Sequence, residues 1–245
     1  MKVVFFGATK GMGRALARLM AQRGDALCLL GRDGDDLARS AQDLRLHGAS
    51  GEVGTVVCDL LEPQSFAPAL DHAAAALNGF DTVVVTAGLF AAQEALEQDA
   101  ALRDRVLTAD FINTVHFCEE ARARLLAKGG GTLCVFSSVA GERARKPVIL
   151  YGAAKAGLSH YLNGLDHKFR AQGLRVVLVK PGFVKTGMTV GLKPPPFAGE
   201  PDEVARAVLT AIDRGWPEVF VPAAWRWVML VIRLLPRAVM RRIGF

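Results

Sequence analysis

Three glycines within seven residues follow the first apolar stretch of the chain. Residues Lys2–Phe6 predict a short strand, and residues 11 to about 23 predict a helix. The turn between them, Gly7-Ala8-Thr9-Lys10-Gly11-Met12-Gly13, lets the backbone fold tightly and approach a pyrophosphate, which the positive end of the helix dipole stabilises. The spacing is Gly-x-x-x-Gly-x-Gly, and such a turn alone is weak evidence for a nucleotide site. Its position between a strand and a helix strengthens the prediction of a dinucleotide-binding α/β fold.

The rest of the chain alternates apolar runs with helical patterns. The strands expected after the turn are residues 26–30, 53–57, 81–85, 133–136, 175–179 and 219–221. The helices expected between them are residues 63–77, 99–128, 150–172 and 201–214. With 245 residues, 51% of them hydrophobic, the chain suits one α/β domain with a large core. We predict a Rossmann-type doubly wound parallel sheet of about seven strands in a three-layer αβα arrangement over residues 1–222, followed by a tail at residues 223–245.

Tyr151 and Lys155 stand four residues apart in the predicted helix 150–172, so their side chains share one face. An ammonium beside a phenol favours the phenolate and is expected to lower the pKa of Tyr151 from its usual value of about 10. Ser138 ends a predicted strand 13 residues earlier, where its hydroxyl can hold a carbonyl oxygen beside that phenol. Ketone reduction needs a proton donor, a cation that tunes it and a hydroxyl that positions the substrate.

Two further motifs accompany this set. Ser138-Val139-Ala140-Gly141 precedes Tyr151, and Pro181-Gly182-Phe183-Val184-Lys185-Thr186 follows a later strand. A lone Tyr-x-x-x-Lys pair is usually a half-buried aromatic beside a solvated cation, but spaced motifs in this order reverse that interpretation. Together they resemble the short-chain dehydrogenase/reductase family across almost the whole chain. The resemblance implies hydride transfer from a nicotinamide to a ketone carbon, with Tyr151 as proton donor, Ser138 orienting the oxygen, and Lys155 lowering the Tyr151 pKa and gripping the ribose.

The resemblance also implies where the cofactor lies. Asp59-Leu60 resembles the pair that flanks the adenine, and Thr186 corresponds to the threonine that contacts the nicotinamide carboxamide. Thr86-Ala87-Gly88 departs from the family's Asn-Ala-Gly, so a hydroxyl replaces the amide that steadies this strand. The implied contacts are Gly7, Thr9, Lys10, Gly11, Met12, Gly13, Arg32, Asp59, Leu60, Ala87, Gly88, Tyr151, Lys155, Pro181, Gly182, Val184 and Thr186.

The end of the second predicted strand bears on the choice of cofactor. A carboxylate there accepts the ribose hydroxyls of NAD, whereas the 2′-phosphate of NADP needs a cation. Arg32 takes that place, and Lys10 lies where a second cation can reach the same phosphate, which favours NADP(H). In the alternative, Arg32 is solvated, Asp33 binds the ribose and the cofactor is NAD.

Asp110 departs from the family at a catalytic position. Counting back 28 residues from Ser138 places Asp110 where the family has an asparagine that kinks the helix and holds a water linking the catalytic lysine to solvent. An aspartate still accepts hydrogen bonds from water, but it adds a charge beside Lys155. Either Asp110 serves this relay, or Asn113, one turn later, replaces it.

Three cations, Arg143, Arg145 and Lys146, lie between Ser138 and Tyr151. They indicate an anionic substrate, because guanidinium groups and ammonium charges both suit phosphate. In the alternative they lie on a solvated loop. Residues 189–199, with three consecutive prolines, are expected to form a loop over the substrate.

The net charge of +6 resides mainly at the end of the chain. No acidic residue follows Glu218, whereas five arginines do: Arg226, Arg233, Arg237, Arg241 and Arg242. The first four are expected on one stripe of a helix that is too short and too often interrupted by arginine to span a bilayer. We expect this helix to lie in a membrane interface, or alternatively in the subunit interface of a homo-oligomer. The apolar side chains expected to enter the lipid are Trp225, Trp227, Val228, Met229, Ile232 and Leu235.

Composition narrows the remaining classes. The folded body shows no basic stripe interleaved with aromatic residues, so no nucleic-acid partner is expected. Four cysteines, Cys28, Cys58, Cys118 and Cys134, each lie in an apolar run without ligand spacing, which predicts buried thiols in a reducing cytosol and no metal site. The first residues enter a strand at once and are too short for a signal sequence. The expected location is therefore the cytoplasm, with the tail touching the inner face of the membrane.

Two segments narrow the resemblance within the family. Residues 141–146, together with residues 221–226 and 235–237, resemble the decaprenylphosphoryl-2-keto-erythro-pentose reductases, which reduce a keto-sugar carried on a polyprenyl phosphate. This implies a lipid-linked ketone as substrate, and a long-chain lipid or steroid ketone is the alternative small-molecule substrate. A non-catalytic NADP-sensing module and a membrane scaffold are alternatives of another class. The complete set Ser138, Tyr151 and Lys155 argues against both, because neither needs a proton donor.

Overall fold

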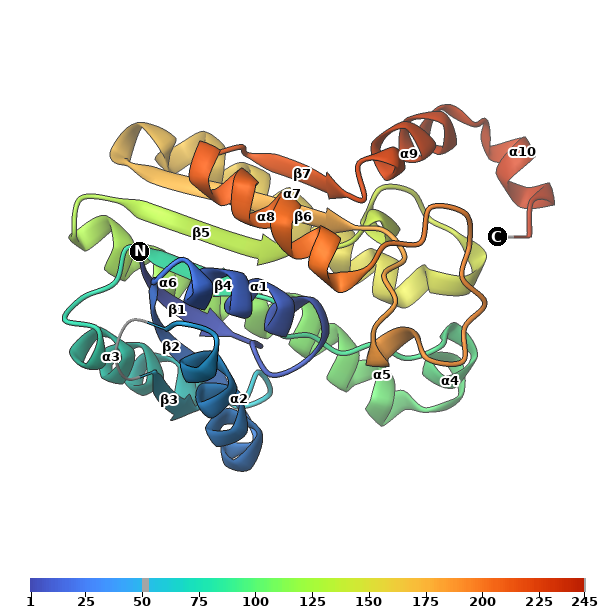
Figure 1. Ribbon diagram of the computed structural model, residues 1–245. Coiled ribbons are helices and arrows are strands. Elements are labelled where there is room, and N and C mark those ends of the chain that lie inside the picture. The colour runs from blue at the N-terminus through green and yellow to red at the C-terminus, as the bar shows by residue number, and fades with distance from the viewer. Residues whose placement is uncertain (50–52, 245) are drawn as a thin grey trace.

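A parallel sheet of seven strands, in the order β3-β2-β1-β4-β5-β6-β7, forms the centre of the molecule (Figure 1). The structure is a computed structural model, and it describes residues 1–49 and 53–244. The strands are β1 (Lys2–Phe6), β2 (Ala26–Gly31), β3 (Gly54–Val57), β4 (Thr82–Val85), β5 (Gly131–Phe136), β6 (Leu174–Pro181) and β7 (Glu218–Val221). The order reverses between β1 and β4, and crevices at such switch points, beyond the carboxyl ends of the strands, are where these folds bind ligands.

Helices cover both faces of the sheet and confirm the predicted three layers (Figure 1). They are α1 (Gly11–Gln22), α2 (Gly34–Leu46), α3 (Phe66–Ala76), α4 (Gln93–Gln98), α5 (Ala100–Leu107), α6 (Thr114–Ala127), α7 (Ile149–Phe169), α8 (Pro201–Arg214), α9 (Ala224–Leu234) and α10 (Arg237–Arg242). Helices α1, α2 and α8 contribute to one apolar core, and α3, α6 and α7 contribute to the other. The sequence did not predict α2 and α4.

The inner strands are apolar on both faces because both faces are covered. In β4, Val83 and Val85 pack into the core beneath α3, α6 and α7, whereas Val84 packs into the core beneath α1, α2 and α8. Continuous apolar runs of this kind are typical of buried parallel strands. This explains why all seven strands could be located from the sequence, although their ends shift by one or two residues.

The predicted helix 99–128 is not continuous. A π-helical turn, Thr108–Asn113, separates α5 from α6 and is labelled η2 below. Turns of this type place an extra residue into one turn of helix and occur often at functional sites. Here the turn contains both Asp110 and Asn113, so the departure from α-helix falls on the residues under consideration for the proton relay.

The tail forms two helices, which corrects the prediction of a single arginine stripe. Helix α9 ends before Leu235, whose backbone is extended because Pro236 follows it. Arg226 and Arg233 lie on α9, whereas the other three arginines lie on α10. Phe245 lies outside the described residues. Among residues 1–49 and 53–244, no helix combines the length and the apolar character needed to cross a bilayer.

The tail prediction was also wrong about three of its side chains. Trp225, Met229 and Ile232 are buried against Val139 and do not face outward. Trp227, by contrast, is 67% exposed. The apolar side of α9 that the sequence assigned to lipid is therefore partly the side that packs on the protein.

Candidate active site

The glycine turn lies between β1 and α1 as predicted, and Thr86 holds it in place. Gly7 has a φ of 101°, a left-handed conformation that favours glycine. The Thr86 hydroxyl donates a hydrogen bond of 2.8 Å to the Gly7 carbonyl oxygen. A Cβ at Gly13 would collide with that same oxygen. The hydroxyl at position 86 thus ties the end of β4 to the turn, a contact that the sequence did not predict.

A cavity of about 380 Å³ opens at the carboxyl ends of β1, β2 and β4. The predicted contacts that line it are Gly7, Thr9, Lys10, Gly11, Met12, Gly13, Arg32, Asp59, Leu60, Ala87, Gly88 and Thr186. Tyr151, Lys155, Pro181, Gly182 and Val184 were also predicted as contacts but do not line this cavity. A cavity beside a glycine turn and the amino end of α1 suits the phosphates and adenosine of a dinucleotide.

The adenosine end of this cavity carries charges of both signs. Arg32 is exposed and has no hydrogen bond or ion pair within the described chain. Lys10 lies 2.9 Å from the Asp36 carboxylate, so part of its charge is already compensated. The Asp33 side chain accepts a hydrogen bond of 2.9 Å from the Asp36 backbone N–H and caps α2. Arg32 is therefore the cation that remains available for a 2′-phosphate.

Ser138, Tyr151 and Lys155 come together beyond the end of β5. Ser138 caps the short helix Val139–Gly141, its hydroxyl accepting the Ala140 N–H at 3.1 Å. Tyr151 packs edge-on against Phe90, with ring centroids 5.2 Å apart. The Lys155 ammonium lies 5.6 Å from the centre of the Tyr151 ring and is only 4% exposed. The structure thus brings the predicted catalytic residues into one cluster.

Two residues that the sequence did not assign hold this cluster in position. The Ser137 hydroxyl donates to the Lys155 carbonyl oxygen at 2.9 Å and lies 2.7 Å from the Ser159 hydroxyl. These buried contacts fix α7 against the end of β5. Because Ser137 directly precedes Ser138, its side chain points to the other face of the chain, and only its position in a Ser-Ser pair could have indicated this role.

Of the two candidates for the relay, Asp110 faces Lys155. One Asp110 carboxylate oxygen accepts the Leu89 N–H at 2.7 Å, and the other lies 3.7 Å from the Lys155 ammonium without a hydrogen-bond partner. Asn113 points elsewhere, since its amide donates to the Leu60 carbonyl oxygen at 2.8 Å. A Cβ at Gly88 would lie 3.0 Å from Asp110 and 3.6 Å from Lys155, so this cluster borders the dinucleotide cavity.

Burial dominates the ionisation of the cluster. It raises the pKa of the Asp110 carboxyl, while the attraction of Lys155 and the Leu89 N–H oppose the shift. Burial and the charge of Asp110 also raise the pKa of the Tyr151 phenol, against a smaller contribution from the Ser138 hydroxyl. The lowering expected from Lys155 was therefore wrong for the net shift. A phenol with a raised pKa is held in its protonated, proton-donating form.

Two of the three cations before Tyr151, which the sequence assigned to an anionic substrate or to a solvated loop, contact the tail. Arg143 donates to the Leu235 carbonyl oxygen at 2.9 Å, and Lys146 donates to the Arg241 carbonyl oxygen at 3.0 Å. Arg145 is half-buried, and its buried Nε has no partner in the described chain. Burial lowers the pKa of its guanidinium. Of the three, Arg145 is the cation whose missing hydrogen-bond partner an anionic ligand could supply.

The four cysteines are buried and free, as predicted. Burial raises the pKa of the Cys28 thiol to about 11, so this side chain is an unreactive thiol at neutral pH. Within residues 1–49 and 53–244, no group of three or more His, Cys, Asp or Glu side chains is arranged to hold a metal ion.

Comparisons with known proteins agree with this geometry. The sequence model of the short chain dehydrogenase family matches residues 1–195. An uncharacterized oxidoreductase of Mycobacterium tuberculosis is 36% identical over 98% of this chain and 96% of its own length. Carbonyl reductase family member 4 of Xenopus tropicalis is 26% identical over 85% and 89%. A solved short-chain type dehydrogenase/reductase from Mycobacterium ulcerans superposes with a TM-score of 0.81, covering 89% of this chain and 86% of that chain at 22% identity, which supports the fold.

Proposed function

This chain belongs to the short-chain dehydrogenase family, and from that premise we propose that it is an NADPH-dependent reductase of a ketone. The observation that carries the proposal is the cluster of Ser138, Tyr151 and Lys155 at the border of the dinucleotide cavity. A bound nicotinamide dinucleotide supplies the hydride in this chemistry. The glycine turn and the residues of the cavity would hold its phosphates and adenosine, and Arg32 favours the 2′-phosphate of NADP over NAD.

Each catalytic side chain has a separate task. Ser138 orients the carbonyl oxygen of the substrate by a hydrogen bond, and Tyr151 donates a proton to that oxygen. Lys155 lies beside the Tyr151 ring and stabilises the phenolate as it forms. Asp110 takes the place of the asparagine in the proton relay that the family resemblance implies, because its free oxygen faces the ammonium and can accept a hydrogen bond from a water that links Lys155 to solvent.

The substrate we propose is a keto-sugar carried on a polyprenyl phosphate. Arg145 supports an anionic substrate, because a half-buried guanidinium without a partner gains most from a ligand that brings negative charge. The basic apolar tail supports a substrate met at a membrane surface, with peripheral contact by the enzyme. A long-chain lipid or steroid ketone is the second candidate, which the exposed apolar face of α9 would equally suit.

The substrate is tested by the oxidation of NADPH in the presence of paired keto-sugars with and without a lipid phosphate. We expect the phosphorylated member of each pair to have the lower KM, and Arg145→Gln to remove most of that difference while sparing the neutral member. Equal KM values for both members in the wild-type enzyme would show that the substrate is not recognised through its phosphate.

The chemistry is tested by Tyr151→Phe. Removing the proton donor should lower turnover by at least about 10²-fold, the lower end for general acid catalysis, while NADPH binding stays near that of the wild type. Tyr161→Phe is the matched control, because Tyr161 lies on the same helix and its hydroxyl donates to Glu119 at 2.6 Å, away from the cluster. If Tyr151→Phe retains the activity of the control, Tyr151 is not the acid.

A further inference from the structure

Half of the exposed large apolar side chains in the described chain lie in two segments, residues 188–197 and helix α9. In the first segment Val190 is 80% exposed and Phe197 is 59% exposed. On α9, Trp227, Val231 and Leu234 are exposed at steps of four and three residues, so they form one stripe opposite the buried side of the helix. Neither group packs on the protein, and both belong to segments around the proposed site.

The two segments are joined to each other. The indole N–H of Trp225 on α9 donates a hydrogen bond of 3.0 Å to the Phe197 carbonyl oxygen. The same indole covers Gly182, where a Cβ would collide with the ring. Figure 1 shows the orange loop that contains residues 188–197 beside α9, at the same end of the molecule. The loop and the helix therefore present their apolar side chains as neighbouring parts of one surface.

Phe197 adopts a conformation that its own side chain disfavours. Its φ is 65°, in the left-handed region, where residues other than glycine are strained. The exposed ring does not recover this cost by packing within the described chain. Strain of this kind points to a role for the outward ring that the isolated fold does not use.

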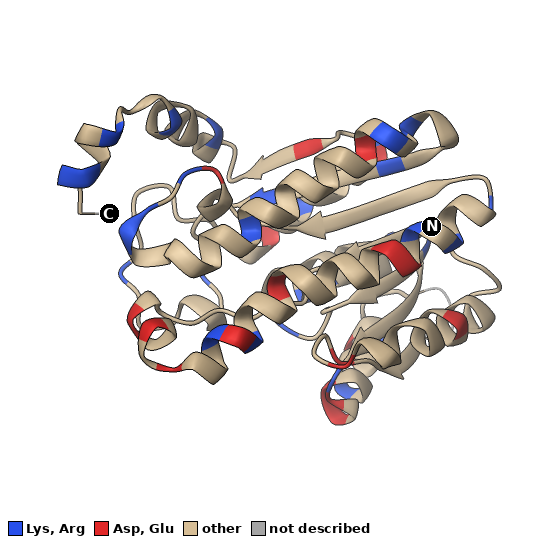
Figure 2. Cartoon of the chain, turned by 180° about the vertical axis from the view of Figure 1, so that it is seen from behind, with Lys and Arg blue, Asp and Glu red and all other residues tan. Residues whose placement is uncertain are grey.

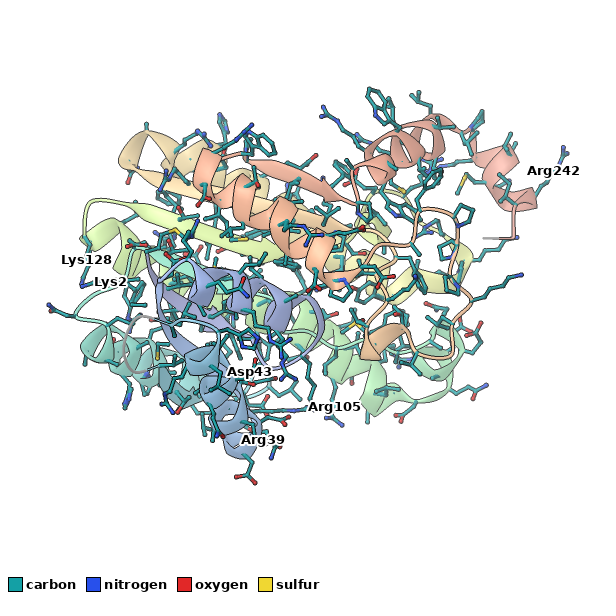
Figure 3. The ribbon with its side chains drawn as sticks, viewed as in Figure 1. Lys2, Arg39, Asp43, Arg105, Lys128 and Arg242 are labelled. Atoms are coloured by element: carbon teal, nitrogen blue, oxygen red, sulfur yellow. The ribbon has the colours of Figure 1, made fainter. Side chains whose placement is uncertain are left out.

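The charges of this surface identify its partner. Residues 187–199 contain Lys193 and no acidic residue, and no acidic residue follows Glu218. Figure 2 shows α9 and α10 with blue segments and no red ones. In Figure 3 the Arg242 side chain extends from the end of α10 away from the body of the protein. Exposed apolar side chains flanked by cations alone match an anionic lipid surface, which offers acyl chains beneath negative headgroups.

We propose that residues 188–197 and helix α9 together form one docking surface for an anionic lipid bilayer. The loop enters the interface with Val190, Leu192 and Phe197, beside the stripe of α9. Because Met188 of the same loop lines the dinucleotide cavity, docking places the entrance of the active site at the lipid surface. The proposed function already places the tail at the membrane, and this surface adds the loop to that contact. Only the reason for docking, access to a membrane-borne substrate, rests on the proposed function.

The loop is tested by co-sedimentation with vesicles of phosphatidylglycerol and phosphatidylcholine. The variant Val190→Ser, Leu192→Ser, Phe197→Asn should bind at least about tenfold more weakly, because three apolar side chains no longer leave water. Val231→Ser with Leu234→Ser should weaken binding similarly. Leu46→Ser is the control, since Leu46 is 81% exposed on α2, a helix outside this surface, and should bind as the wild type does.

Phe197→Gly tests whether weaker vesicle binding results only from a loss of folding. Glycine accepts the left-handed backbone, so this variant should keep or raise the melting temperature while it binds vesicles more weakly. The proposal is overturned if the loop variants bind vesicles as the wild type does. It is also overturned if the wild type ignores vesicles and light scattering shows that the same substitutions abolish a dimer, because the surface is then a subunit interface.

The proposed function is measured separately, as reduction of a water-soluble ketone without vesicles. Loss of vesicle binding in the α9 variant Val231→Ser, Leu234→Ser with that activity intact supports the docking surface and leaves the chemistry standing. Absence of ketone reduction in the wild type with normal vesicle binding would remove the proposed function and leave the docking surface.

Discussion

Asp110 places a buried carboxylate beside Lys155, the lysine of the proposed catalytic set. Both side chains are buried, and the oxygen that faces Lys155 has no hydrogen bond within the described chain. The separation of 3.7 Å allows attraction but no hydrogen bond. Because desolvation outweighs this attraction, the carboxyl holds its proton more tightly in the folded protein than in the unfolded chain.

Asp110→Asn tests this balance through stability. With a pKa raised by folding, the native state binds the extra proton, so the contribution of Asp110 to stability is present below its unfolded pKa and is lost as pH rises through its folded pKa. Asparagine does not titrate, so the stability of the variant does not fall in this pH range for that reason. Its gain in melting temperature over the wild type should therefore be larger near pH 8 than near pH 4. A uniform loss at both pH values would show that the attraction between Asp110 and Lys155 is the larger contribution.

The same variant should change the pH profile of turnover. Asp110 raises the pKa of Tyr151, so its removal should lower that pKa and move the basic limb of the reduction profile to lower pH. We expect the maximal rate to be retained or increased, because the sequence resemblance places an asparagine at position 110 in the short-chain dehydrogenase family. A collapse of the rate across the whole profile would show that the carboxylate itself transfers a proton.

Arg32→Ala tests the choice of cofactor. A charge-assisted contact with the 2′-phosphate contributes roughly 1.5–3 kcal/mol, so the variant should bind NADPH about 10- to 100-fold more weakly while NADH binding changes little. Titration of both cofactors measures this. Arg39→Ala is the control, because Arg39 also lies on the exposed part of this region but pairs with Asp36 (Figure 3). A wild-type enzyme that prefers NADH would transfer the role to Asp33.

At the scale of elements, helix α9 is held against the segment that carries Ser138. Glu142 belongs to this segment and joins it to β6 and to α9, with one carboxylate oxygen 2.7 Å from the Lys180 ammonium on β6 and the other 3.2 Å from the Arg233 guanidinium on α9. Trp225 packs against Val139 on the same side. The tail therefore packs against the segment that carries Ser138 and helps to hold it in position.

Arg233→Glu tests whether the contact between Glu142 and Arg233 holds α9 in place, and Arg226→Glu is the matched control. Both substitutions reverse a charge on α9, but only the first places a carboxylate beside the buried Glu142. A loss of about 1 kcal/mol, modest because Arg233 is half-exposed, corresponds to a melting temperature about 2–4 °C lower for a chain of this size. Arg226→Glu should leave it unchanged. Equal melting temperatures for the two variants would show that the contact does not hold α9.

The sequence located the elements whose signals are local and missed those that depend on distant contacts. The glycine turn, the seven strands and the Tyr-Lys pair each follow from residues close in the chain. The π-helical turn around Asp110 does not, because no local pattern marks it and because Leu89 and Lys155, which Asp110 contacts there, are distant in the sequence. The partners of Arg143 and Lys146 are backbone oxygens more than ninety residues away, and periodicity alone could not indicate which apolar side of α9 is buried.

The charge of the whole molecule is unevenly distributed. The cations of α9 and α10 lie at one end of the molecule without acidic neighbours on those helices, whereas α2, α5, α6, α7 and α8 each carry both signs (Figure 2). If the proposed docking surface meets an anionic bilayer, this charge would attract one end of the molecule before any apolar side chain enters the lipid. This orientation depends on charge and should be weakened by salt, because exposed charges are screened.

Arg237→Glu with Arg242→Glu tests this orientation without disturbing the fold. Both arginines are exposed on α10, and within residues 1–49 and 53–244 neither has an ion pair like the one with Glu142 that makes Arg233 unsuitable for this purpose. Each cation near an anionic surface contributes about 1 kcal/mol, so the double reversal should weaken binding to phosphatidylglycerol vesicles by more than about tenfold at low salt. The difference from the wild type should shrink as salt is added.

Arg105→Glu with Lys128→Glu is the matched control for that variant, since these two exposed cations lie away from the tail (Figure 3). It changes the net charge by the same amount, so it should bind vesicles nearly as well as the wild type if location governs the attraction. Reduction of a short water-soluble ketone should be unchanged in both variants, because neither pair lies in the proposed site. If both variants lose vesicle binding equally, net charge rather than the tail directs the protein to the membrane, and the tail has no orienting role.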